Sequence, residues 1–514
     1  MYSTCSVNQS KSGRPTLRTI GLTTLALFAL AGCEGDDGAV GATGAVGPAG
    51  PEGPQSEPPT IGEAFVWDAR SEGQYAGTAF QNNSSKQGHP KGAVWLNYNT
   101  LVDPETWEYR PKSELADLLD GKEVDGAQFQ RYEAGGTVPL GEGEAYAEGD
   151  TIITYCETTF RAMVTGFTTA AILGYPTRFY DGAMVEWNSL SHMHDEDGDY
   201  LLPSDSPWRT DNDLSHYMYA DSTDGIEGRT IPNPYATHTN VIIQEDYAYK
   251  KGKDYGAPVI SATPADIARE SADDYNDNEN GLITAATLQH WIDNWGDHAP
   301  EGIDGNLIIL QVNAAEDDDD EAKAGSYITD SNDGVTTYVI DTDRLVQTRF
   351  NGVKESRSMV PSGEQMDAFL GDFDLNPTQD MIVWVMGEPG AGHAMRQGRG
   401  WYAFRYWGVA HDHLAMLNGG ADHVMDESYM GDTITCDERI NDTCPPGSGT
   451  VTVKDLPEDN TALQATLQDM VHLAKGAANG EGTGGAEDHN DENDEDDEDD
   501  EDDNGDPPNA CASL

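Results

Sequence analysis

A β-rich run that leads directly into a helix constrains the fold of this chain more than any other segment. Residues 151–155 are threonine, isoleucine and tyrosine, which favour a strand, and a helical run from Ala162 to Leu173 ends before Gly174. A strand followed at once by a helix is half of a βαβ unit, and the loop between them lies at the carboxyl end of a parallel strand, where ligands bind. Residues 156–161 form this loop, so we expect a site there.

The same alternation of strand-like and helical runs occurs in two parts of the chain. Strand-like runs are predicted at 64–68, 94–96, 151–155 and 178–180, and again at 307–312, 381–386 and 414–417. Such alternation is typical of parallel α/β sheets. We therefore predict a leader at 1–32, a spacer at 33–60, a first unit at 61–200, a polar insertion or linker at 201–281, a second unit at 282–426, a remainder at 427–480 and a tail at 481–514. The remainder holds an amphipathic helix near 463–474.

The first 32 residues are predicted to be an export signal. Three basic residues precede an apolar stretch at 20–30 that is too short to span a membrane. The sequence Leu30-Ala-Gly-Cys33 resembles the lipobox of bacterial lipoproteins, which implies cleavage before Cys33 and lipidation of that cysteine. Glu34 stands where an aspartate would retain a lipoprotein in the inner membrane, so an outer-membrane location in the cell envelope is preferred. The alternative is a plain secretory signal followed by an unrelated cysteine.

The segments that flank the globular part have biased compositions. Glycine recurs at every third residue from Gly35 to Gly53, a collagen-like pattern that predicts an extended spacer, with a trimerising stalk as the alternative. Fifteen acidic residues lie within 487–506 and predict a disordered tail, for solubility or for loose calcium binding. The net charge of −63 argues against nucleic acid and anionic lipid as partners. Contact with a membrane is therefore expected through the lipid anchor only.

The six cysteines have separate explanations. Cys436 and Cys444 bracket a short polar loop and are predicted to form a disulfide in an exported chain. Cys156 is left without an evident partner at the start of the predicted loop. Loop amides and the N-terminus of the following helix would stabilise a thiolate there, which predicts a nucleophile. The signal, the anchor and the tail account for the others, which are Cys5, Cys33 and Cys511.

Six motifs follow one another along the first unit. They are Val66-Trp-Asp68-Ala-Arg70-Ser71, Tyr75-Ala-Gly77, Gly88-His89-Pro90-Lys91-Gly92-Ala93, Tyr155-Cys156 to Arg161-Ala162, Leu173-Gly174-Tyr175 and Tyr180-Asp181-Gly182-Ala-Met-Val-Glu186-Trp187. In this order they resemble the rhodanese family, the thiosulfate sulfurtransferases. The second unit is similar to the cysteine-free half of two-domain members. It opens with a helix expected at 282–288 and carries Met386-Gly-Glu-Pro-Gly at the loop position.

The resemblance implies an α/β fold of two rhodanese-like domains, each a parallel five-stranded sheet flanked by helices, the second of them inactive. It implies that Cys156 takes sulfane sulfur from a small donor as a persulfide and passes it to a thiol or another thiophilic acceptor, without a cofactor or a metal. Asp68 and Arg70 are expected to be a structural pair that braces the loop. The donor's charge would be held by the residues of the loop, which are Glu157, Thr158, Thr159, Phe160 and Arg161.

The composition of the loop narrows the reaction. Cys-x4-Arg is the short loop of sulfurtransferases, whereas the related phosphatases have one residue more, so phosphatase activity is disfavoured. Thr159 stands where the family often has glycine, which reduces backbone freedom. Glu157 places an anion beside the thiol and would repel a dianionic donor. A neutral persulfide or another thiol compound therefore competes with thiosulfate as the expected donor.

A non-catalytic function also stays open from the sequence. The chain would then be a rhodanese-fold surface binding or assembly protein of the cell envelope, with an envelope protein as its partner. The collagen-like spacer favours this alternative, and the preserved Cys-x4-Arg favours the enzyme. Two weaker patterns suggest cations: a histidine–aspartate cluster at 192–199, for which chance in an acid-rich chain is the better account, and a segment at 276–283 that resembles the start of an EF-hand loop.

Overall fold

The computed structural model describes residues 64–79, 87–133, 136–190, 194, 198, 201, 240–312, 327–329, 332–351, 355–431, 436–437, 444 and 447–478. All of them fall in one compact unit, Gly53–Leu514. The predicted signal, Cys33, the spacer and the acidic tail lie outside the described residues, so the predictions for them stay predictions. Among the residues described, no helix has both the length and the apolar character needed to cross a membrane.

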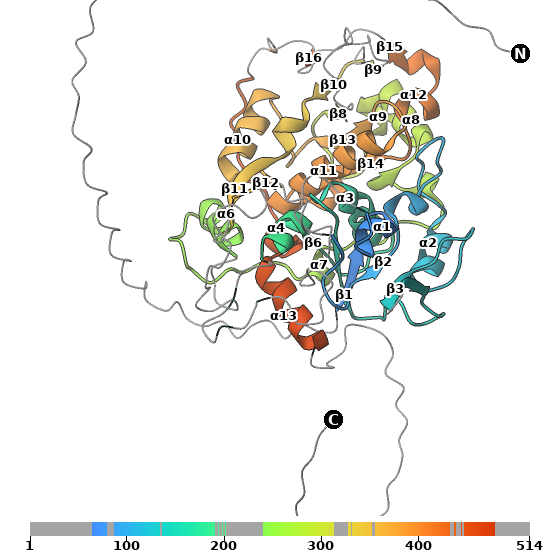
Figure 1. Cartoon of the computed structure of the whole chain (residues 1–514). Helices are drawn as coiled ribbons and strands as arrows, with labels where there is room; N and C mark the ends of the chain where they lie inside the picture. Colours follow the sequence, from blue (N-terminus) through green and yellow to red (C-terminus); the bar gives the residue numbers. More distant parts are fainter. Residues whose placement is uncertain are drawn as a thin grey trace, which may run out of the picture. The chain divides into compact units, whose positions relative to one another are not determined.

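The first sheet contains the strand that precedes Cys156. Its strands lie in the order β17-β6-β5-β1-β2-β3-β4, of which β6, β1, β2 and β3 are labelled in Figure 1. The pairs from β17 to β2 are parallel, whereas β3 pairs antiparallel with β2 and with β4. The strands are β1 (Ala64–Asp68), β2 (Val94–Trp95), β3 (Gln130–Glu133), β4 (Gly136–Pro139), β5 (Thr151–Tyr155), β6 (Thr177–Tyr180) and β17 (Gln464–Ala465).

The second sheet is parallel throughout, in the order β16-β10-β8-β13-β14-β7. Its strands are β7 (Gly281–Ile283), β8 (Leu307–Val312), β10 (Val335–Ile340), β13 (Met381–Met386), β14 (Leu414–Leu417) and β16 (Cys436–Asp437). Two short antiparallel pairs accompany it: β11 (Gln347–Phe350) with β12 (Glu355–Met359), and β9 (Tyr327–Ile328) with β15 (Met430–Gly431). The predicted α/β class with parallel strands is therefore confirmed.

Helices connect most of the strands. They are α1 (Glu72–Tyr75), α2 (Lys112–Leu119), α3 (Phe160–Phe167), α4 (Ala183–Ser189), α6 (Val241–Lys251), α7 (Pro264–Ile267), α8 (Ala285–Asp293), α9 (Trp295–His298), α10 (Gly363–Asp372), α11 (Ala391–Trp407), α12 (Ala421–Val424) and α13 (Leu467–Ala478). Helix α3 continues as one π-helical turn, η2 (Thr168–Ile172), and a 3₁₀ turn, η1 (Tyr98–Leu101), follows β2.

The prediction of five strands in each sheet is wrong. The first sheet has seven strands, since the β3–β4 hairpin extends one edge and the distant strand β17 forms the other. The second has six, since β16 extends one edge. Residues 464–465 were expected to be helical, but they pair with β6, and the helix begins only at Leu467. The expected helix at 282–288 is likewise a strand over Gly281–Ile283, followed by α8 after the Thr284 cap. Strands of two or three residues are too short for a recognisable hydrophobic period.

The end of the predicted polar insertion packs into the fold. Helix α6 buries Ile242 and Tyr247, and its Asp246 carboxylate accepts two hydrogen bonds of 2.8 Å from the guanidinium of Arg349 on β11. The prediction of a polar linker over 201–281 is therefore wrong from residue 240 onward. Helix α6 has apolar side chains, of which Ile242 and Ile243 are buried, but it is also held by a buried ion pair that a hydrophobic pattern does not reveal.

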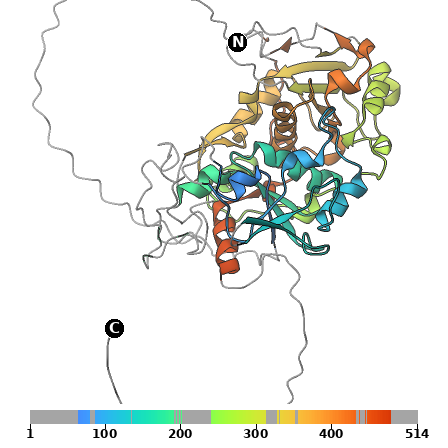
Figure 2. The same cartoon turned by 45° about the vertical axis from the view of Figure 1, so that its right-hand side comes forward.

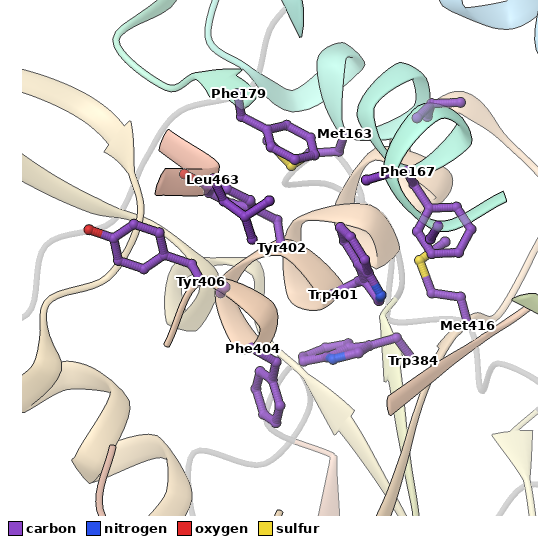
Figure 3. Close-up of a cluster of buried hydrophobic side chains, with 14 of the residues drawn as sticks. Met163, Phe167, Phe179, Trp384, Trp401, Tyr402, Phe404, Tyr406, Met416 and Leu463 are labelled. Atoms are coloured by element: carbon purple, nitrogen blue, oxygen red, sulfur yellow. The ribbon is translucent and has the colours of Figure 1, made fainter. Parts of the chain in front are cut away.

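Helices α3 and α11 pack against each other between the two sheets (Figure 3). The ring of Phe167 meets that of Trp401 edge to face at 5.0 Å, and Phe179 and Tyr402 lie 4.6 Å apart. A Cβ atom on Gly398 would come within 2.8 Å of the Met163 side chain, so glycine permits this close approach. The aromatic run at 401–407 thus forms core packing, as its pattern predicts.

The C-terminal helix, α13, packs against the first sheet, although most strands of that sheet lie far from it in sequence. Both views show α13, in red, beside the blue and green elements of that sheet (Figures 1 and 2). Leu467, Met470 and Val471 are buried against residues of β1, β5 and α4. The guanidinium of Arg178 on β6 donates to the Asp469 carboxylate at 2.8 Å. Before this helix in the chain, Cys436 and Cys444 are joined by a disulfide across a Cα–Cα distance of 5.5 Å.

Candidate active site around Cys156

Cys156 directly follows β5, which lies between β1 and β6 in the first sheet. Parallel pairing on both sides fixes the carboxyl end of this strand, because β1 aligns with it over its whole length. The cysteine is 1% exposed and packs with Ala69 and Ala162, while the half-buried Tyr98 lies against this group. Cys156 lines neither the cavity beside Asn418 nor the small one beside Gly182.

The backbone of the loop is held from one side only. The carbonyl oxygens of Cys156 and Glu157 accept hydrogen bonds from the N–H groups of Met184 and Val185 in α4, at 3.1 and 3.2 Å. Within the described part of the chain, the next four backbone N–H groups donate no hydrogen bond; they belong to Thr158, Thr159, Phe160 and Arg161. Free N–H groups at the start of a helix attract an anion. The predicted cradle spans the amides of Glu157 to Arg161, and four of these five make no hydrogen bond among the described residues.

Thr159 adopts a left-handed backbone conformation, although it stands where the family often has the more flexible glycine. Its φ of 64° lies in the left-handed region, where a β-branched residue is strained. Its hydroxyl donates to the carbonyl oxygens of Tyr180 and Asp181, at 3.0 and 2.8 Å, and the side chain is fully buried. These hydrogen bonds provide what a glycine would not, a side chain that anchors the loop to the residues after β6.

A buried charge network lies behind the loop. The Arg70 guanidinium contacts the Asp68 carboxylate at 2.7 Å and the Glu157 carboxylate at 3.1 Å, and all three side chains are almost fully buried. Burial disfavours the charged form of Arg70, but the two carboxylates outweigh it and raise the pKa of Arg70. Glu157 is thus not the unpaired anion that the sequence suggested, because its charge is compensated by Arg70.

Asp68 and Arg70 lie where a bracing pair is expected. The Tyr155 hydroxyl donates to Asp68 at 2.8 Å, and Arg70 also donates to the Gln87 side chain at 3.2 Å. The network therefore ties β1, the end of β5 and the Gly88 turn to the residue after Cys156. Its members contact the loop from the protein interior and leave the four free N–H groups untouched.

The polar side chains nearest the surface of the site are those of Arg161 and Tyr98. Arg161 donates to the Gln74 side chain at 2.8 Å and stays partly exposed. Burial raises the pKa of Tyr98, while the positive charge of Arg161 opposes that shift. Tyr98 was not identified from the sequence. Its position three residues after β2, at the same edge of the sheet as the cysteine loop, is the signal that would have found it.

The equivalent loop of the second sheet contains no thiol. It runs from Gly387 to Gly390, between β13 and α11. The Gly387 N–H donates to the Val312 carbonyl at 3.1 Å, so part of this loop is bonded to the neighbouring strand. The residues offer no nucleophile at the position that Cys156 occupies in the first sheet.

Of the two sequence patterns that suggest cation binding, the segment at 276–283 lies within the described residues and the cluster at 192–199 lies mostly outside them. Of the histidine–aspartate cluster, only His194 and Gly198 belong to the described residues. The Asn278 amide accepts from the Ala272 N–H and donates to the Leu282 carbonyl, at 2.8 and 2.7 Å, so it serves the backbone. No group of three or more metal-ligating side chains lies together among the described residues. An open cavity of about 870 Å³, lined by acidic residues such as Asp103 and Asp274, lies beside Asn418 at the end of β14.

Comparison with known proteins finds a match for the part of the chain that holds β1 to β6. Residues 55–190 match the family model of the rhodanese-like domain. The chain is 31% identical over 127 residues to a thiosulfate sulfurtransferase of Pseudomonas aeruginosa, covering 24% of this chain and 36% of that enzyme. The chain therefore spans about a third of the length of that relative.

Two solved structures are similar over much of this chain. YnjE has a TM-score of 0.35 at 12% identity, covering 76% of this chain and 64% of that one. An anaerobic ergothioneine biosynthesis enzyme from Chlorobium limicola has a TM-score of 0.24 at 15% identity, covering 76% and 62% of the two chains.

Proposed function

We propose that this protein is a sulfurtransferase that carries sulfane sulfur on Cys156, because residues 55–190 match the family model of the rhodanese-like domain. The observation that carries the proposal is the position of Cys156, at the carboxyl end of β5 and directly before four free backbone N–H groups. Free N–H groups at the start of α3 attract negative charge, so they would favour an anionic donor or a persulfide at this position. No cofactor is required for this chemistry.

The first half-reaction loads the enzyme. The Cys156 thiolate attacks the outer sulfur of the donor, for example thiosulfate or a low-molecular-weight persulfide. The new sulfur–sulfur bond forms as the donor's own sulfur–sulfur bond breaks, and sulfite or a thiolate leaves with the bonding electron pair. The amide groups of 158–161 would hold the negative charge during the transfer. Arg161, at the end of the loop, would hold an anionic donor.

The second half-reaction transfers the sulfur atom from Cys156 to an acceptor. A nucleophilic acceptor, such as cyanide or a thiolate, attacks the terminal sulfur of the Cys156 persulfide. The persulfide bond breaks, and its electron pair returns to Cys156 as the thiolate. No net oxidation of the protein occurs over the cycle, so a single reactive cysteine is sufficient.

The pairing of Glu157 with Arg70 bears on the choice of donor. A compensated carboxylate repels a dianion less than a free one does, so thiosulfate fits the loop better than its sequence suggests. Thiosulfate and small persulfides therefore belong to one assay series, together with mercaptopyruvate.

Replacing the cysteine tests the activity. We expect Cys156→Ser to lose sulfur transfer with every one of these donors, since the hydroxyl cannot form a persulfide. Cys511→Ser is the matched control and retains full activity. The measurement is thiocyanate formation with cyanide as acceptor, together with mass spectrometry for one added sulfur atom on the peptide that contains Cys156. Full turnover by the Cys156→Ser enzyme is the result that would exclude the proposed nucleophile.

The location of the protein is a further part of the proposal. We infer an exported lipoprotein of the cell envelope, anchored through Cys33 and preferably in the outer membrane, with the Gly-X-Y segment as a spacer. A second, inactive rhodanese-like domain would comprise the second sheet. Metabolic labelling with a fatty acid tests the anchor, because Cys33→Ser removes the label if the lipobox is used.

A non-catalytic role has one structural observation in its favour. Cys156 is 1% exposed, and a buried thiol suits a rhodanese-fold binding or assembly protein of the cell envelope. Alkylation of Cys156 across pH separates the two functions. A thiol that reacts readily below pH 8 supports catalysis, whereas a thiol that stays inert in the native protein supports the binding role.

A further inference from the structure

A buried ion pair connects the two sheets close to the cysteine loop. The Asp181 carboxylate, directly after β6, lies 2.5 and 3.2 Å from the guanidinium of Arg399 on α11. Neither side chain is exposed. The same carboxylate accepts a hydrogen bond of 2.6 Å from the Val360 N–H, directly after β12. Asp181 is therefore held from both of these elements by residues that accompany the second sheet.

The backbone around Asp181 in turn holds the cysteine loop. Its carbonyl oxygen accepts the hydroxyl of Thr159 at 2.8 Å. Three residues later, the N–H of Met184 donates to the Cys156 carbonyl at 3.1 Å. Between them Ala183 has a φ of 54°, in the left-handed region, so this turn is strained and needs surrounding contacts to keep its shape.

Arg399 is itself fixed by the second sheet's surroundings. Its guanidinium donates to the Ser358 carbonyl at 2.6 Å and to the Leu345 carbonyl at 3.3 Å. It also lies 5.2 Å from the ring centre of Tyr402 and 6.0 Å from that of Phe160, the first residue of α3. A rigid cation thus contacts both Asp181 and the residue that begins the helix after the cysteine loop.

We propose that Arg399 is a positioning residue for Cys156, and that the cysteine-free second unit sets the geometry of the sulfur-carrying loop through the Arg399–Asp181 pair. This inference rests on the proposed sulfurtransferase function. The second unit then has a role besides packing at the interface, because it holds the turn after β6 in place. Residues of that turn and of α4 bind the carbonyl oxygens of Cys156 and Glu157 and the hydroxyl of Thr159. A displacement of about 1 Å at a reacting atom lowers the rate roughly a hundredfold.

A second buried pair provides a matched control. Arg349 and Asp246 make two contacts of 2.8 Å, and the residues are 8% and 2% exposed. Tyr406 also donates to Asp246 at 2.7 Å. This pair joins α6 to β11. Arg349 also donates at 3.4 Å to the carbonyl of Val360, whose N–H donates to Asp181, but among the described residues the pair makes no hydrogen bond to the cysteine loop or to Asp181 itself. Its removal costs stability for the same physical reason but leaves the loop in place.

The experiment compares Arg399→Met with Arg349→Met in the full chain. For each we would measure unfolding by urea, steady-state sulfur transfer and the rate of iodoacetamide alkylation of Cys156 against pH, by mass spectrometry of its peptide. Both variants are expected to lose stability. Only Arg399→Met should lose about a hundredfold in kcat and shift the alkylation midpoint to higher pH. Arg399→Lys, which keeps the charge, should recover part of both.

The outcomes separate this inference from the function on which it rests. If the two methionine variants have the same kcat and the same alkylation profile at equal folded fraction, Arg399 is merely structural and the inference is overturned. If the native protein transfers no sulfur but only Arg399→Met shifts the alkylation profile, the positioning stands and the sulfurtransferase proposal falls. Should Arg399→Met not fold, the same comparison is made between Asp181→Asn and Asp246→Asn.

Discussion

The two sheets place five strands in the same spatial order, but the chain reaches that order by different routes. The second sheet reads β7-β14-β13-β8-β10, with its edge strand β7 first in sequence. The first reads β17-β6-β5-β1-β2, and its corresponding edge strand β17 comes last. In both, a threonine caps the helix that follows the edge strand: the N–H of Thr287 donates to Thr284, and that of Asp469 donates to Thr466. The edge strand and the helix after it are therefore equivalent in the two sheets by their place in the sheet, although they come from opposite ends of the sequence.

The comparison also shows what distinguishes the two central loops. Both follow the middle strand of the five and precede a helix at the interface, α3 or α11. The first holds Cys156 with free N–H groups after it, whereas the second has a glycine and proline sequence. The same framework therefore carries a cysteine loop in one sheet and, in the other, a loop without a thiol that leads into the helix of Arg399.

Removing the C-terminal segment is expected to have the largest effect. A chain that ends at Leu463 lacks β17 and α13, and with them the buried side chains of Leu467, Met470 and Val471. Fully burying such side chains stabilises by about 1.5–3 kcal/mol each, a sum comparable to the stability of a whole domain. We expect the first sheet to unfold and the second to persist, as measured by hydrogen exchange.

The control for this truncation is a chain that lacks only residues 481–514. It should match the native protein in hydrogen exchange and in sulfur transfer. If the amides of β5 are protected from exchange in the chain ending at Leu463 as well as in this control, β17 is not needed for the stability of the first sheet. The two edge strands would then share a position in their sheets but not a stabilising role.

A pH dependence of stability is expected next in size. One contribution comes from His89 beside the first sheet and another of the same sign from His411 beside the second, because burial lowers the pKa of both imidazoles. Burial lowers the pKa of His89 from 6.5 to about 4, where its imidazole stacks on Tyr75 at 3.9 Å. The unfolded chain therefore binds more protons between these values, so stability is lost as pH falls from 6.5 towards 4, by up to about 3 kcal/mol.

Urea unfolding at several pH values tests this contribution. His89→Gln has no imidazole to protonate, so its stability should fall less than that of the native protein over the same interval. The exposed His423 is the control, and His423→Gln should follow the native curve. Equal slopes for all three proteins would mean that His89 is not buried as a neutral group.

The smallest expected effect concerns Thr159. It lies in the Cys156 loop, whose counterpart in the second sheet has no thiol. Thr159→Val keeps the shape of the side chain but leaves the carbonyl oxygens of Tyr180 and Asp181 without their donor, at a cost of about 1–2 kcal/mol. Thr159→Gly loses the same hydrogen bonds but relieves the strain at a φ of 64°, so it should be the milder change.

Stability and kcat together decide this prediction. We expect Thr159→Val to lower both, and Thr159→Gly to lower kcat with little change in the free energy of unfolding. A valine variant as stable and active as the native protein would contradict the role given to the hydroxyl.

The sequence predicts the central strands well and the edges poorly. The runs at 64–68, 151–155, 307–312, 381–386 and 414–417 match β1, β5, β8, β13 and β14, because buried parallel strands are apolar and recognisable. β10 was missed although it is six residues long, since two threonines interrupt its apolar residues. β17 was assigned to a helix because its partner lies about 285 residues away along the chain.

The sequence by itself determined that Cys156 stands between a strand and a helix, since both elements have strong local periods and a glycine marks the helix end. Only the tertiary structure decided that Arg70 compensates Glu157, that Arg399 holds Asp181 and that residues 464–465 complete the first sheet. The physical reason is that local periodicity reflects which face of an element is buried, whereas ion pairs and edge pairing depend on which distant segments meet.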